Sequence, residues 1–131
     1  MKTTKSPSPF VGCWETKWSV CNGGWAGAWL ALKADVVNPT QLTGAWGGHT
    51  DANGYEHSGF LVGKLDKAGK VLAGTWYEII YEDNLACPTL SYSGTFRFTL
   101  TGPDAFAGEW TDADGPNKGC TNKMQWNGTR V

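Results

Sequence analysis

The chain has 131 residues, which suits one domain with one hydrophobic core, and its formal net charge is −1 with 18% charged residues. A nearly neutral chain offers no electrostatic basis for binding nucleic acid or an anionic membrane surface. No apolar run approaches the roughly 18 residues of a membrane-spanning segment, and no cofactor-binding motif is present.

Eighteen glycines and eight tryptophans dominate the composition. Glycine is used at about twice its average frequency. Glycine without a collagen period, mixed with Trp, Thr and Val, indicates turns and strands rather than helices. We therefore expect an all-β protein.

The chain opens with MKTTKSPSPF, whose lysines are followed by no apolar stretch. This segment lacks the pattern of a signal peptide and is rich in Pro and Ser. We expect residues 1–10 to form a flexible N-terminal arm and residues 11–131 to form a single β-barrel domain.

Strand patterning is clearest in LSYSGTFRFTLT, residues 90–101, where apolar and polar residues alternate. A period of two places the apolar residues on one face of a strand. The same pattern, interrupted by turn residues, predicts eight strands near residues 12–18, 25–34, 41–47, 58–66, 70–81, 90–101, 105–111 and 124–131. The second strand also fits a helix on its apolar spacing, but the alternation of Trp25, Gly27 and Trp29 favours a strand.

Eight consecutive antiparallel strands favour an up-and-down meander β-barrel, because closure removes the exposed sheet edges. A two-sheet β-sandwich is the alternative. In such a barrel the longer links, near 19–24, 48–57, 82–89 and 112–123, share one end. We expect that end to be an open mouth and the opposite end to be closed.

Three motifs, LTGAW, LAGTW and FAGEW, end strands at this mouth. In each motif we expect the first apolar residue to pack deep, the tryptophan to lie near the rim, and the glycine to leave space for a neighbouring indole. Six tryptophans are expected to ring the mouth, namely Trp18, Trp25, Trp46, Trp76, Trp110 and Trp126. The alternative is that they simply fill the barrel as core.

Indoles and a few polar groups suit a concave binding site. The expected polar groups are Thr16, Glu78 and Tyr92. Suitable ligands are a sugar, a fused heterocycle or a quaternary ammonium group. We therefore predict a non-enzymatic binding protein for a small molecule or sugar. An enzyme in which Glu78 acts as a general acid is a weaker alternative, because neither His49 nor His57 has a partner in a recognisable catalytic motif.

Four cysteines favour disulfides and a secreted or extracytoplasmic compartment, with unpaired thiols in a cytosolic protein as the alternative. They are Cys13, Cys21, Cys87 and Cys120. Counting does not separate the three pairings, but Cys87 and Cys120 lie in links that flank neighbouring strands, so their pairing is the simplest. Three of the cysteines share the mouth end with His49. A metal site made of these thiols and the imidazole is a weaker alternative. No CxxC spacing exists, and we predict no metal.

The outer face of the barrel is expected to carry an apolar patch. If Leu61 points inward, Phe60 and Val62 point outward, and Tyr77 and Ile79 do so on the next strand. An exposed patch of this kind predicts self-association. An assembly or protein-interaction module with a filled barrel is therefore the alternative function.

The sequence Gly12-Cys13-Trp14 near the start, together with Arg130 near the end, resembles the calycin superfamily of avidins, lipocalins and fatty-acid-binding proteins. In calycins a G-x-W on the first strand packs under a basic side chain from near the chain end. The resemblance implies that Trp14 and Arg130 meet at the closed end. PFVGCWE is also similar to the opening of a fatty-acid-binding protein, but the paired-helix lid of that branch does not follow.

The layout is closest to the avidin branch. LTGAW is similar to the third avidin strand, which implies that Trp46 touches the ligand. The chain departs from avidins at Thr16 and Val20, where the family supplies an Asn and a Ser to biotin. It departs again at Gly48, where a ligand-binding hydroxyl is expected. The resemblance therefore implies a small-ligand barrel without the full biotin-binding set.

Overall fold

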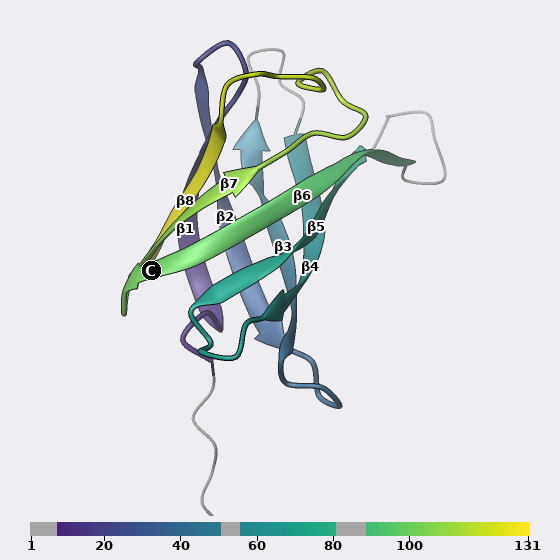
Figure 1. Cartoon of the computed structure of the whole chain (residues 1–131). Helices are drawn as coiled ribbons and strands as arrows, with labels where there is room; N and C mark the ends of the chain where they lie inside the picture. Colours follow the sequence, from purple (N-terminus) through teal and green to yellow (C-terminus); the bar gives the residue numbers. More distant parts are fainter. Residues whose placement is uncertain (1–7, 51–55, 81–88) are drawn as a thin grey trace, which may run out of the picture.

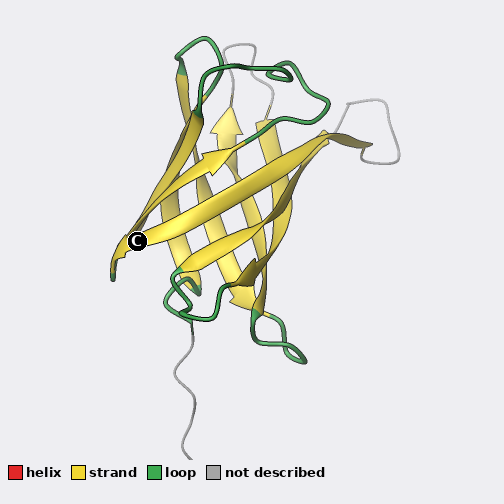
Figure 2. Ribbon diagram, viewed as in Figure 1, coloured by secondary structure: helices red, strands yellow, loops and turns green. Residues whose placement is uncertain are grey.

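The computed structural model describes residues 8–50, 56–80 and 89–131, which form strands and connecting turns without a helix (Figure 2). The strands are β1 (Gly12–Ser19), β2 (Trp25–Ala34), β3 (Gln41–Thr50), β4 (Glu56–Leu65), β5 (Val71–Ile80), β6 (Thr89–Gly102), β7 (Ala105–Trp110) and β8 (Met124–Arg130). The strand predicted at 25–34 is confirmed, and its helical alternative is wrong. The described part of the chain contains no helix with the length and apolar character to cross a membrane.

The eight strands close into one barrel in sequence order, and every neighbouring pair is antiparallel (Figure 1). Pairing of β1 with β8 completes the barrel and runs from Trp14 opposite Arg130 to Trp18 opposite Trp126. This arrangement confirms the predicted up-and-down meander barrel and excludes the sandwich. Closure pairs the two edge strands that an open sheet would leave exposed.

The inward faces of the strands form a packed core inside the barrel. Successive side chains of a strand point to opposite faces, so each strand contributes alternate residues to the interior. The largest fully buried side chains are Trp14, Phe10, Phe98, Leu30, Leu42, Leu61 and Leu72. These side chains therefore fill the interior of the barrel toward its closed end.

The closed end is held by Arg130 lying over Trp14. The guanidinium carbon is 4.3 Å from the Trp14 ring centroid. Arg130 Nη1 donates a hydrogen bond to the Val11 carbonyl at 3.0 Å, and Trp14 Nε1 donates one to the Phe10 carbonyl at 2.9 Å. Asp104 Oδ1 lies 3.4 Å from Arg130 Nε. One cation thus joins the last strand to the chain segment that enters the first.

Gly12 and Phe10 show how the start of the chain packs into the closed end of the barrel. Gly12 has a φ of 131°, and a Cβ added there would lie 2.8 Å from Arg130 Nη1. A side chain at Gly12 would therefore be strained and would collide with the guanidinium. Phe10, predicted from the sequence to belong to the flexible arm, is fully buried, with its ring centroid 6.3 Å from that of Phe106. The packed core therefore begins before residue 11.

We expect Arg130→Ala to lower the free energy of unfolding by about 2 kcal/mol, because it removes a cation–π contact and a hydrogen bond donated by a charged group. Urea unfolding followed by circular dichroism measures the change. Arg97 is exposed on β6, so Arg97→Ala is the matched control and should change stability by less than about 0.5 kcal/mol. Equal losses in the two variants would contradict the role given to Arg130.

Candidate functional site

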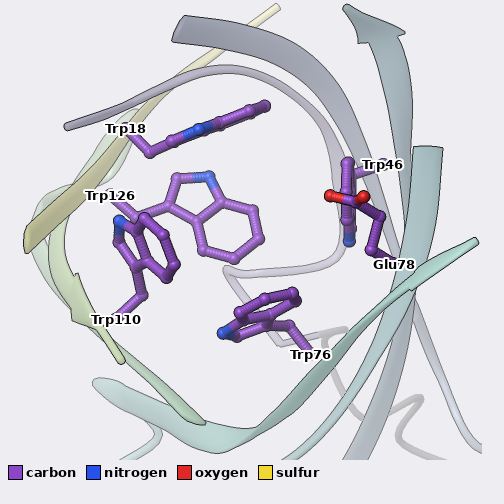
Figure 3. A pocket seen from close by; sticks show the side chains of 6 residues that line it. All are labelled: Trp18, Trp46, Trp76, Glu78, Trp110 and Trp126. Atoms are coloured by element: carbon purple, nitrogen blue, oxygen red, sulfur yellow. The ribbon is translucent and has the colours of Figure 1, made fainter. Parts of the chain in front are cut away.

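A pocket opens inside the barrel at the end that carries the longer links. It is lined by Trp18 of β1, Trp46 of β3, Trp76 and Glu78 of β5, Trp110 of β7 and Trp126 of β8 (Figure 3). Its volume is about 60 Å³. Five of the six tryptophans predicted to ring the mouth line this pocket, and four of them, Trp46, Trp76, Trp110 and Trp126, also belong to the buried core.

Three of these indoles stand nearly perpendicular to one another. The ring centroids of Trp18 and Trp46 are 5.9 Å apart with an interplanar angle of 68°, and Trp18 and Trp126 have the same values. Trp46 and Trp126 are 6.4 Å apart at 89°. In Figure 3, Trp126 is seen face-on while Trp18 and Trp46 are nearly edge-on. The planes of the three rings are therefore steeply inclined to one another, so the rings face the pocket from three directions.

The other two indoles are fixed by hydrogen bonds to the backbone. Trp76 Nε1 donates to the Thr111 carbonyl at 2.8 Å, and Trp110 Nε1 donates to the Ser19 carbonyl at 2.9 Å. Their ring centroids are 5.5 Å apart, at an interplanar angle of 78°. Because their N–H groups are bonded within the protein, these rings present mainly apolar surface to a ligand.

Cross-strand glycines make room for two of the indoles. Gly59 pairs with Trp46, and a Cβ added there would lie 2.4 Å from the Trp46 ring. Gly94 pairs with Trp76 and would meet its Nε1 at 2.7 Å. The glycine of the LTGAW motif, Gly44, instead makes room for Leu32, which its Cβ would approach to 2.7 Å. The expectation that the motif glycines accommodate the indoles is therefore wrong; glycines on the adjacent strands do so.

Glu78 is the one charged side chain among the described residues that line the pocket. Its side chain is 14% exposed, and its Oε1 lies 3.5 Å from His57 Nδ1. The Ser91 hydroxyl donates a hydrogen bond to the same Oε1 at 3.3 Å. Figure 3 shows the Glu78 side chain among the residues that line the pocket. The site therefore combines apolar ring surface with a single negative charge.

Two indole N–H groups in the pocket wall lack a hydrogen-bond partner. Among the described residues, the buried side-chain nitrogen and oxygen atoms without a partner are Nε1 of Trp46 and Nε1 of Trp126. A buried donor left unsatisfied costs about 1–3 kcal/mol. These two groups are therefore candidates for contact with an acceptor atom of a bound molecule or with water.

Three predicted site residues lie outside the pocket lining. Thr16 is 1% exposed, and its hydroxyl donates to the Ala28 carbonyl at 2.9 Å, so it serves the core. Tyr92 is half-buried and packs against the core cluster. Trp25 is 56% exposed and faces outward.

The outward position of Trp25 follows from the face that β2 turns to the core. Ala28 and Leu30 are buried, so the odd-numbered residues point away from the interior, and Trp29 is 52% exposed as well. Alternation was predicted correctly for this strand, but the inward face was assigned wrongly. A period of two does not say which face is inside, and tryptophan is not an unambiguous core residue.

A disulfide joins two of the links at the mouth. It connects Cys21 to Cys120, so the predicted pairing of Cys87 with Cys120 is wrong. Both cysteines are thereby removed from the metal-ligand set that included His49. Cys13 is free and exposed, and Cys87 lies outside the described residues. The pairing depends on how the links between β1 and β2 and between β7 and β8 approach each other, which strand order alone does not determine.

The link from 111 to 123 has its own internal framework, which the sequence patterns did not identify as part of the site. The Asp112 carboxylate accepts hydrogen bonds from the backbone N–H of Gly115 at 2.8 Å and of Asn117 at 2.9 Å. The Asn117 side chain accepts one from the Cys21 N–H at 3.0 Å. The DADG turn at 112–115 is the sequence signal for this structure. In Figure 1 the link arches over the end of the barrel.

Neither a protein-family model nor a curated protein sequence matches the chain. In structure it is similar to a redesigned β-barrel, with a TM-score of 0.71 and 15% identity over 98% of this chain and 99% of that one. It is also similar to the redesigned barrel mFAP1 bound to DFHBI (TM-score 0.69, 15% identity, 95% and 100% covered). A fluorescence-activating β-barrel designed de novo matches with a TM-score of 0.65 and 11% identity, over 98% and 100% of the two chains. Because the identities are this low, the structural likeness shows only the fold, an eight-stranded antiparallel barrel. It does not single out the avidin branch.

We expect a Cys21→Ser, Cys120→Ser double variant to lose about 3–5 kcal/mol of stability, because the cross-link joins cysteines separated by 99 positions in the sequence. Thermal unfolding without reductant measures the loss. The matched control is Cys13→Ser, which replaces the exposed free thiol and should leave the melting temperature unchanged. A double variant as stable as the control would contradict a stabilising role for the disulfide.

Proposed function

We propose that this protein binds a small molecule in the tryptophan-lined pocket and does so without catalysing a reaction. The observation that carries the proposal is the change of packing along the barrel axis. Leu42, Leu72 and Phe98 are fully buried toward the closed end, whereas the indoles at the mouth, although four of them are only 4–9% exposed, line a pocket of about 60 Å³. Concave, mostly apolar pockets with few polar groups are typical small-ligand sites.

Barrels of this architecture accommodate small molecules. The redesigned barrels mFAP1 and mFAP0 are each bound to DFHBI. The likeness concerns the fold, so it supports the capacity of such a barrel and not the identity of the ligand. About eight strands enclose an interior wide enough for side chains or for one small ligand.

The proposal includes no reaction step. Glu78 and its neighbour His57 form a carboxylate–imidazole pair. Orientation of a ligand by this carboxylate requires no nucleophile or second carboxylate, whereas glycoside cleavage needs a pair of carboxylates flanking the bond. The disulfide between Cys21 and Cys120 is compatible with an oxidising, extracytoplasmic compartment.

Titration of the wild-type protein with oligosaccharides, biotin-like heterocycles, quaternary ammonium compounds and fatty acids should give a saturable shift in tryptophan emission with one class. We expect Trp18→Ala to weaken binding of that class at least about tenfold, measured by calorimetry, because an aromatic wall of the site is lost. Trp25→Ala is the control, since Trp25 is exposed on the outer face. Unchanged affinity in Trp18→Ala would place the ligand elsewhere.

A second candidate function, self-association through the outer face, is favoured by one contact. The rings of Phe60 on β4 and Tyr77 on β5 stack at 4.7 Å with an interplanar angle of 19°. Val62 and Ile79 belong to the outward face of the same two strands, as their pairing shows. We propose this patch as the contact surface between copies, because adjoining apolar side chains on an outer face favour association.

If the patch joins two copies, sedimentation should show a dimer that dissociates on dilution, and a Phe60→Ser, Tyr77→Ser variant should remain monomeric at concentrations where the wild type is dimeric. Arg97→Ser, at an exposed position on β6, should leave the dimer intact. A wild type that stays monomeric at every concentration would remove this second function.

A further inference from the structure

We propose that the ligand of the pocket is a small organic cation carrying a methylated ammonium group. This inference rests on the binding function proposed above and names its ligand class. It follows from three properties of the pocket: the angles between its rings, its charge, and the scarcity of hydrogen-bonding groups in its lining.

The ring geometry suits a compact, rounded group. Trp18, Trp46 and Trp126 are mutually inclined at 68–89°, with centroids 5.9–6.4 Å apart. A flat heterocycle would stack best between parallel rings, which this arrangement does not offer. A trimethylammonium group is nearly spherical, so its methyl groups can contact several perpendicular ring faces at once. Cations within about 6 Å of a ring centroid are attracted by the negative face of the ring, and indole is the best such partner.

The charge of the pocket favours a cation over an anion. Glu78 contributes the one charge among the described lining residues, and its side chain is only 14% exposed. A carboxylate in a partly desolvated site attracts a cation more strongly than it would in bulk water. A fatty acid would bring its own carboxylate toward Glu78 and would be repelled. The described residues that line the pocket include no lysine or arginine to offset that repulsion, and the basic group beside Glu78 is the imidazole of His57, 3.5 Å from its Oε1.

The few polar groups in the lining disfavour a sugar. A sugar presents hydroxyls around its ring, and each buried hydroxyl needs a hydrogen-bond partner. The N–H groups of Trp76 and Trp110 are already donated to backbone carbonyls, which leaves Nε1 of Trp46 and Nε1 of Trp126 as two unpartnered donors for the several hydroxyls of a sugar. A trimethylated ammonium has no hydroxyl and no N–H at its head, so it leaves no such group unsatisfied.

The test compares choline with its neutral carbon isostere, in which a tert-butyl group replaces the trimethylammonium group. We expect choline to bind at least about tenfold more tightly in calorimetry, because the two molecules share their shape and differ in charge. Equal affinities, or saturable binding of another class without choline, would overturn the cation inference but leave small-molecule binding in place. If no compound of any class binds, both proposals fail.

The role of the carboxylate is tested with Glu78→Gln, which keeps the side-chain size and removes the charge. We expect this variant to bind choline about tenfold more weakly and to bind the neutral isostere with unchanged affinity. The matched control is Glu109→Gln, because Glu109 is exposed on β7 and pairs with Lys123 at 2.9 Å. A Glu78→Gln variant that keeps full affinity for choline would overturn the assignment of the charge.

Discussion

The pairing of β1 with β8 is the constraint on which the rest of this structure depends. It closes the sheet, and closure sets which side chains share the interior. The contact of Arg130 with Trp14 fastens that pairing at the closed end, where the guanidinium also bonds the Val11 carbonyl. Without this closure the indoles of β1 and β8 would lie on opposite edges of an open sheet. With it, Trp18 and Trp126 become neighbours across the last seam.

The pocket exists because the barrel is filled unevenly. Leucine and phenylalanine side chains are fully buried toward the closed end, whereas the rings at the mouth meet edge to face and line a small pocket. Edge-to-face contacts are a favourable arrangement for aromatic rings, so these indoles stabilise one another without collapsing into a stack. The indole N–H groups of Trp76 and Trp110 donate hydrogen bonds to backbone carbonyls, and these bonds hold the two rings in place. A site with fixed walls loses little side-chain entropy when a ligand binds.

The mouth is reinforced by contacts distant in sequence. The disulfide between Cys21 and Cys120 connects two links near the pocket, and Asn117 bonds the backbone of the first link from the second. Trp110 Nε1 reaches the Ser19 carbonyl, at the end of β1. These contacts tie the β1–β2 link to the β7–β8 link across the seam between β1 and β8. The same region thus completes the barrel and supports the proposed binding site.

Strand number and strand order could be predicted from the sequence, because alternation and turn residues act locally and a meander fixes which links share an end. That the tryptophans form a binding mouth stays a prediction. The inward face of β2 could not, since Trp25 and Leu30 both fit a half-buried strand. The cysteine pairing could not either, because link paths are set by long-range contacts such as that of Asn117 with Cys21. Tertiary structure alone decided the angles at which the indoles that line the pocket meet, because ring angles depend on packing between strands.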